Sequence, residues 1–292
     1  MASGSPLYDL KRQLESNAKG YGQIDCKICH GMGIFYDPFF GQTKRMGSYR
    51  LCKCVEEQTV CDGNPPYEYF DFEKNAVVAC PTKPARLVLQ QILELERNSG
   101  IPDRYRGRLI ESVDISGDSS MNVLIALDHA AHAIQSFGSN QVKGLYLYGP
   151  TGAGKTLLSC VILNELIRLY RADAHYAKIS RDIIGKLRDT FNPQSEAYGE
   201  GRRIEQELGK YPALVIDDFG VQRESPWVNS VLYDLIDTRY ENNLLTILTS
   251  NEPMDSWKEI AGGRVLSRLR EMCLEIHMEA PDFRLRESKS IR

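Results

Sequence analysis

The sequence predicts an α/β fold in which a parallel sheet is flanked by helices, preceded by a small cysteine-rich domain. Three observations support this prediction. From residue 119 onward, short apolar runs alternate with helical patterns, which is typical of strands covered by helices on both faces. A glycine-rich turn lies between one such run and one such helix. Finally, most of the cysteines lie in the first 80 residues, where helical periodicity is absent from residue 21 on.

The elements follow in order along the chain. Residues 1–20 resemble a short polar helix or a frayed end, and proline residues break any long element between 21 and 85. A helical stripe of leucine and isoleucine runs from Leu87 to Leu95 and stops before Gly100. Strands are expected at 144–148, 174–178, 213–216 and 244–248, and helices at 119–137, 157–166, 181–190 and 228–236. A further helix is expected between a loop at 192–202 and the strand at 213–216.

Residues 149–156 read Gly-Pro-Thr-Gly-Ala-Gly-Lys-Thr and match the phosphate-loop pattern G-x-x-x-x-G-K-[ST]. An apolar strand precedes the loop and a helix follows it, so backbone N–H groups and the helix dipole would surround phosphate oxygens. Lys155 is expected to bind the β- and γ-phosphates of ATP, and the Thr156 hydroxyl to bind Mg²⁺. The predicted nucleotide-binding residues are Gly149, Pro150, Thr151, Gly152, Ala153, Gly154, Lys155, Thr156 and Leu157.

Two other strand ends complete this predicted P-loop NTPase site. The apolar run 213–216 ends in Asp217 and Asp218. Asp217 is expected beside the Mg²⁺, and Asp218 is expected to polarise the attacking water. The strand at 244–248 ends in Thr249, Ser250 and Asn251, whose polar groups would face the γ-phosphate or the water. We therefore expect an Mg²⁺-dependent ATPase.

Composition sets the broad class. The chain has 292 residues, a formal net charge of −3 and 42% hydrophobic residues, which is typical of a globular protein and excludes a uniformly basic one. The N-terminus lacks the pattern of a signal peptide, and no apolar run approaches the roughly 18 residues that cross a bilayer. We expect a cytoplasmic protein without membrane contact.

A reducing compartment favours a metal site over disulfides for clustered cysteines. Cys26 and Cys29 form a C-x₂-C pair, and Cys52 and Cys54 form a C-x-C pair. Two such pairs can supply the four thiolates of a structural Zn²⁺ site. His30, Cys61 and Cys80 remain alternative ligands. Because this region has little aliphatic core, the metal would supply much of its folding free energy, and its loss is expected to spare nucleotide binding.

Residues 100–285 together resemble an AAA+ ATPase of the bacterial replicative helicase-loader family (DnaC/DnaI-like). The resemblance is carried by these segments: 101–106 (Ile-Pro-Asp-Arg-Tyr-Arg), 149–156, 216–220 (Ile-Asp-Asp-Phe-Gly), 248–251, 264–270 (Arg-Val-Leu-Ser-Arg-Leu-Arg) and 281–284 (Pro-Asp-Phe-Arg). It implies self-assembly with the ATP site shared between subunits, an arginine finger at Arg268 with Arg264 one turn earlier, and Asn251 as sensor. It also implies an N-terminal zinc-binding, helicase-interacting domain at 1–85, a linker helix and lead-in at 86–118, and an AAA+ domain at 119–292.

The resemblance implies a DNA replication helicase loader that binds the hexameric replicative helicase and single-stranded DNA. An IstB-like transposition helper ATPase is the alternative, and an unfoldase or a non-hydrolysing nucleotide regulator are more distant ones. Residues proposed to bind DNA phosphates or bases are Lys178, Arg181, Lys186, Arg188, Arg202, Arg203, Tyr176 and Phe191. A solvated helix face is the other interpretation of the basic residues.

Overall fold

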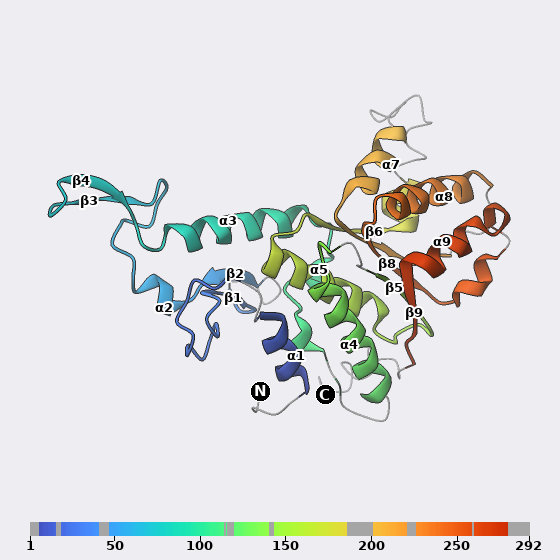
Figure 1. Cartoon of the computed structure of the whole chain (residues 1–292), viewed down its shortest axis with the longest axis horizontal. Coiled ribbons are helices and arrows are strands. Elements are labelled where there is room, and N and C mark those ends of the chain that lie inside the picture. The colour runs from blue at the N-terminus through green and yellow to red at the C-terminus, as the bar shows by residue number, and fades with distance from the viewer. Residues whose placement is uncertain are drawn as a thin grey trace.

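A five-stranded parallel sheet forms the centre of the structure (Figure 1). The structure is a computed structural model, and it describes residues 6–15, 19–40, 47–113, 115, 120–139, 143–185, 201–220, 226–258 and 260–279. The strand order is β6-β7-β8-β5-β9, and each neighbouring pair is parallel. The strands are β5 (Gly144–Tyr148), β6 (Ala174–Lys178), β7 (Ala213–Asp217), β8 (Leu245–Ser250) and β9 (Cys273–His277).

Helices cover both faces of this sheet. On one face lie α4 (Ser120–Gln135) and α5 (Lys155–Tyr170), and on the other α7 (Gly201–Lys210), α8 (Pro226–Glu241) and α9 (Arg264–Met272). Alternate residues of a strand point to the two helical layers: Leu145 and Leu147 pack with α5, whereas Tyr146 packs with α8 and α9. This alternation follows from the two-residue period of a β-strand. Both layers are apolar, so the strands are buried on both sides.

The cysteine-rich region contains two separate antiparallel hairpins. One pairs β1 (Ile34–Asp37) with β2 (Ser48–Leu51) and leads into α2 (Lys53–Glu56). The other pairs β3 (Glu68–Asp71) with β4 (Ala76–Ala79) and projects from the far end of α3 (Lys83–Asn98) in Figure 1. The α3 helix connects this region to the sheet domain through two short 3-10 helices, η1 (Asp103–Tyr105) and η2 (Ile110–Ser112).

The first hairpin and the N-terminal helix pack against the sheet domain. Tyr49 and Leu51 of β2 belong to the same apolar core as residues of α4 and α5. Helix α1 (Pro6–Glu15) contacts η2 and α4, and Glu15 pairs with Arg168 of α5 at 2.8 Å. Arg168 also pairs with Glu165 at 2.7 Å, and all three side chains are largely buried. The first hairpin and α1 are therefore held against the side of α5 rather than extended away from it.

The structure confirms the predicted fold class, and the four predicted strands lie within two residues of their expected bounds. The fifth strand, β9, was not predicted, because its mixture of polar and apolar residues shows neither period clearly. The predicted helix at 181–190 is a π-helix, η3 (Ile179–Gly185), over its described part. Two further 3-10 helices, η4 (Met254–Trp257) and η5 (Ile260–Gly263), precede α9. Among the described residues, no helix is both long and apolar enough to cross a membrane.

Candidate nucleotide site and cysteine cluster

The predicted phosphate loop joins the end of β5 to the start of α5, and its glycines are required by the backbone. Gly149 has φ of 140°, and a Cβ atom there would lie 2.2 Å from the carbonyl oxygen of Met278. Gly154 caps α5 with φ of 90°, which other residues rarely adopt. The N–H groups of the loop and of the first turn of α5 are thus available to an anion at the positive end of the helix dipole.

Lys155 lies inside the loop with only 9% of its surface exposed. Its Nζ donates to the carbonyl oxygens of Gly149 at 2.7 Å and Pro150 at 2.8 Å, and to Oδ1 of Asn251 at 3.1 Å. The structure therefore brings together the predicted lysine and the predicted sensor residue, which are 96 residues apart. An ammonium held at this point can exchange neutral acceptors for the charged oxygens of a phosphate, which are stronger partners.

Asp217 is the centre of a buried hydrogen-bond cluster at the ends of β6, β7 and β8. It is 3% exposed, and its Oδ1 accepts from Thr156 Oγ1 at 2.9 Å and from Thr249 Oγ1 at 2.6 Å. Its Oδ2 accepts from the Tyr176 hydroxyl at 2.6 Å. The pKa of Tyr176 is raised by burial and by the charge of Asp217, so the phenol stays protonated and donates. Thr156 and Asp217 are both oxygen ligands of the kind that Mg²⁺ takes.

Asp218 points to a different partner. Its φ of 61° places it in the left-handed region, and its Oδ2 lies 2.6 Å from Nζ of Lys178. Both side chains are about 40% exposed, so the pair faces solvent at the edge of the site. The prediction that Asp218 polarises water remains a prediction, and Lys178 is the residue that would compete for its carboxylate.

Arg268 contacts side chains of α8 within its own chain. Its Nε donates to Oδ1 of Asp237, and its guanidinium lies 5.1 Å from the Tyr233 ring centroid and 5.6 Å from that of Tyr240. Arg264, one turn earlier on α9, is exposed. The role of Arg268 in a neighbouring subunit's site stays a prediction.

Of the residues predicted to bind single-stranded DNA, three have side chains that the structure describes: Tyr176, Lys178 and Arg181. Tyr176 is 3% exposed, so the prediction that it offers a stacking surface is wrong. Lys178 pairs with Asp218, and Arg181 pairs with Asp182 at 2.8 Å. The remaining predicted residues lie outside the described residues, or have side chains that do: Lys186, Arg188, Phe191, Arg202 and Arg203.

A cavity of about 1530 Å³ extends from the phosphate loop along α5. Its lining includes the loop from Thr151 to Thr156, together with Asp218 and Asn251. It also includes the segment 103–109, which is anchored to α5 because Asn164 Nδ2 donates to the carbonyl oxygens of Tyr105 and Arg108. The lining also includes residues of the first cysteine-region hairpin, which the sequence motifs did not indicate. The cavity exceeds the roughly 300–1,000 Å³ of ordinary ligand pockets.

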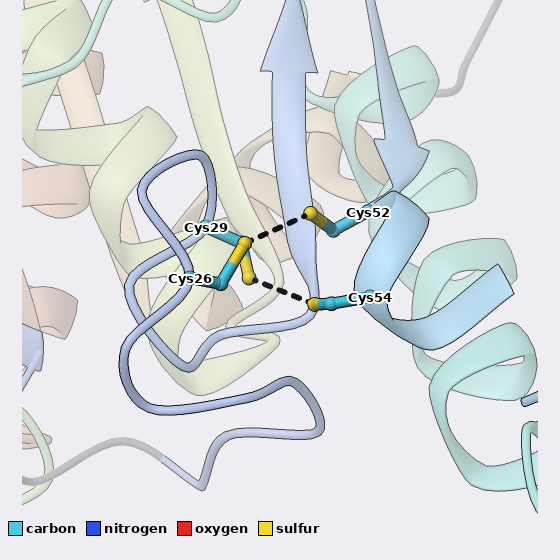
Figure 2. A group of neighbouring side chains, drawn as sticks. All are labelled: Cys26, Cys29, Cys52 and Cys54. Atoms are coloured by element: carbon cyan, nitrogen blue, oxygen red, sulfur yellow. Dashed lines mark hydrogen bonds between the residues drawn. The ribbon is translucent and has the colours of Figure 1, made fainter. Parts of the chain in front are cut away.

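The four predicted zinc ligands converge in space, as Figure 2 shows. The Sγ atoms of Cys26, Cys29, Cys52 and Cys54 all lie within 4.8 Å of one another, with Cys26 to Cys52 at 3.5 Å and Cys29 to Cys54 at 3.6 Å. A tetrahedral site with Zn–S bonds of about 2.3 Å requires sulfur separations of about 3.8 Å, so the donor set and its spacing fit Zn²⁺. This is the one such cluster among the residues that the structure describes.

Within the cluster, backbone hydrogen bonds favour the thiolate at Cys26, whereas burial raises the pKa of the Cys29 and Cys52 thiols. The backbone N–H groups of Cys29 and Ile28 donate to the Cys26 thiol and lower its pKa to about 6. A backbone hydrogen bond joins the two halves of the cluster: the Cys52 N–H donates to the Gly33 carbonyl oxygen at 2.8 Å. Cys80 Sγ instead contacts Thr82 Oγ1 at 3.2 Å, and neither Cys80, Cys61 nor His30 belongs to the cluster.

Comparisons with known proteins cover the sheet domain. A family model described as IstB-like ATP binding protein matches residues 125–290. Replicative helicase loader DnaC of Escherichia coli K12 is 27% identical over 172 residues, which are 59% of this chain and 66% of that protein. Replicative helicase loader DnaI of Bacillus subtilis strain 168 is 24% identical over 225 residues, 70% of this chain and 67% of that protein. The chain therefore spans just under two thirds of the length of DnaC.

Solved structures share the fold. A crystal structure of DnaI covers 65% of this chain and 98% of its own, with 23% identity and a TM-score of 0.52. A crystal structure of the DnaC helicase loader covers 61% and 100%, with 22% identity and a TM-score of 0.52. The parallel sheet, its flanking helices and the phosphate loop thus form an arrangement already seen in that group of proteins.

Proposed function

Because the chain belongs to the IstB-like ATP-binding protein family, we propose that it hydrolyses ATP and loads the hexameric replicative helicase onto single-stranded DNA. The observation that carries the ATPase part is the convergence of Lys155, Thr156 and Asp217 at one end of the sheet. Thr156 Oγ1 lies 2.9 Å from Asp217, and Lys155 is buried beside both the loop and Asn251. The loader part rests on the similarity of this chain to the replicative helicase loaders DnaC and DnaI.

Each residue has a defined task in this proposal. The loop N–H groups hold the phosphates, and Lys155 balances the charge of the β- and γ-phosphates. Thr156 and Asp217 would hold Mg²⁺, which neutralises charge on the phosphoryl oxygens when bound. Tyr176 and Thr249 keep the Asp217 carboxylate oriented through their short hydrogen bonds. Asp218 or Asn251 would position the attacking water.

The cysteine cluster supports the loader over the transposition helper. By the resemblance that the sequence shows, helicase loaders of the DnaI branch carry an N-terminal zinc domain. In the structure the cluster sits in a folded module that α3 joins to the sheet domain. We propose that this module contacts the helicase. Co-purification with the replicative helicase of the same organism, in ATP, tests the assignment. Binding to a transposase and to duplex DNA instead would identify the helper.

Nucleotide binding can be tested at Lys155. Lys155→Ala should weaken ATP binding by on the order of 100-fold, because it removes the one cation of the loop that would contact the β- and γ-phosphates. Lys210→Ala, which changes an exposed lysine at the end of α7, is the matched control and should bind like wild type. Titration with a fluorescent ATP analogue measures both. Equal affinity of the two variants would refute the phosphate-site assignment.

A further inference from the structure

The nucleotide cavity has a wall that the cysteine-rich region supplies. With its phosphates at the loop 149–156, as proposed above, a nucleotide can place its base and ribose in the rest of the same cavity. Within the described residues, the lining contains four aromatic side chains: Phe35, Tyr36, Phe39 and Tyr105. Three of these four belong to β1 and the turn that follows it. Aromatic rings are the groups on which nucleobases stack.

Tyr36 anchors β1 against the sheet domain. Gly107 has φ of 60°, and a Cβ atom there would lie 2.1 Å from the Tyr36 ring, so the ring packs directly on the Gly107 backbone. The Tyr36 ring also meets Tyr49 edge-on, with centroids 5.2 Å apart. Gly107 lies in the same segment, 103–109, that lines the cavity and is bound to α5 through Asn164. The position of β1 relative to the nucleotide cavity is therefore set by direct packing.

The turn after β1 presents Phe39 from a braced backbone. Asp37 Oδ1 accepts from the Phe39 N–H at 3.0 Å, and Arg50 donates to the other carboxylate oxygen at 3.2 Å. The Arg50 guanidinium lies 4.8 Å from the centroid of the Phe40 ring. Phe40 is thus engaged by its neighbours, whereas Phe39 is 91% exposed although it lines the cavity. A braced turn that exposes one large apolar ring at the cavity leaves that ring available for a ligand.

We propose that Phe39 stacks on the base of the nucleoside triphosphate bound at the phosphate loop, with Tyr36 behind it positioning the turn. The proposal rests on the proposed ATP site and extends it, since it makes the cysteine module a part of that site. The sequence predicted that loss of zinc spares nucleotide binding, and the shared cavity argues against that expectation. Because the cysteine cluster holds the two ends of the β1–β2 hairpin, metal loss should release Phe39 and weaken ATP binding.

Two ligands separate base recognition from phosphate recognition. Phe39→Ala should weaken binding of ATP by about 5-fold to 150-fold, the range that one base–aromatic stacking contact contributes. It should leave the affinity for inorganic triphosphate unchanged, because that ligand has no base. Phe72→Ala is the matched control, since Phe72 is 87% exposed on the β3–β4 side and lines no part of this cavity. Both affinities can be measured by calorimetry on the full chain.

Each outcome decides the proposal. A loss for ATP alone in Phe39→Ala, with Phe72→Ala like wild type, supports it. ATP affinity in Phe39→Ala within twofold of wild type overturns it, and so does an equal loss for ATP and inorganic triphosphate. Lys155→Ala distinguishes this failure from failure of the nucleotide site, because it should lose both ligands. If Lys155→Ala loses binding of both ATP and inorganic triphosphate while Phe39→Ala binds both like wild type, the phosphate site is supported and the stacking role of Phe39 is refuted.

Discussion

Arg268 offers a test that separates a catalytic role in a neighbouring subunit from a structural role within its own. Its guanidinium is bound by Asp237, and both side chains are 24% exposed. Such a partly exposed ion pair contributes about 1 kcal/mol at most. The contacts with the Tyr233 and Tyr240 rings add about 0.5–1 kcal/mol each. A purely structural Arg268 is therefore worth about 3 kcal/mol of stability at most.

An arginine that reaches a neighbour's γ-phosphate has a much larger kinetic effect, about 10³–10⁵ in turnover. Arg268→Ala should then bind ATP normally and lose nearly all hydrolysis in the assembled protein. Asp237→Ala is the matched control, because it breaks the same ion pair and keeps the guanidinium. It should lower the thermal midpoint by a few degrees but retain turnover, since 1 kcal/mol corresponds to about 2–4 °C in a chain of this size.

The assay is steady-state phosphate release per folded chain, measured beside thermal unfolding. Mixing Arg268→Ala with Lys155→Ala protein should restore part of the turnover, because some sites then combine an intact loop with an intact arginine. If Asp237→Ala loses hydrolysis as completely as Arg268→Ala, the Arg268 side chain acts by stabilising the packing of α8 on α9 and not by contacting a neighbour's phosphate. Failure of the mixture to recover, with co-assembly demonstrated, would refute the shared site.

Two other predictions concern the N-terminal half of the chain. Metal analysis should find one zinc per chain. The Cys54→Ser variant should lose this zinc, and the Cys80→Ser variant should keep it. Zinc loss in Cys80→Ser would show that the ligand set is wrong. Burial raises the pKa of Glu96, on α3, from 4.5 to about 7. Below about pH 4.5 the carboxyl is protonated in both the folded and the unfolded chain, and the folded protein bears no cost for it. As the pH rises through 7, the buried carboxyl must ionise, and the folded protein loses stability. Glu96→Gln should therefore become more stable than wild type as the pH goes from 4.5 to 8, by on the order of 3 kcal/mol or less. Urea unfolding at the two pH values measures this difference, and a pH-independent difference would contradict it.

Local sequence patterns were sufficient to predict the phosphate-loop motif and the cluster of four cysteines. The loop is contiguous, and its glycines are required by backbone angles at their own positions, such as φ of 140° at Gly149. The cysteines come as two close pairs, so only the approach of one pair to the other depended on the fold. Asp217 was predictable because the carboxyl ends of parallel strands meet at one edge of a sheet. Such features are encoded by neighbouring residues or by the period of one element.

Contacts between distant elements were decided by tertiary packing. The sequence assigned Tyr176 and Lys178 to DNA, whereas adjacent strands place them beside Asp217 and Asp218. Arg268 contacts Asp237 because α9 packs on α8. The hydrophobic periodicity of a helix does not indicate which other helix it contacts. Likewise, Phe39 shares a cavity with a loop more than 100 residues later only because Tyr36 packs on Gly107. A side chain's partner is set by the packing of whole elements, which the residues flanking that side chain do not specify.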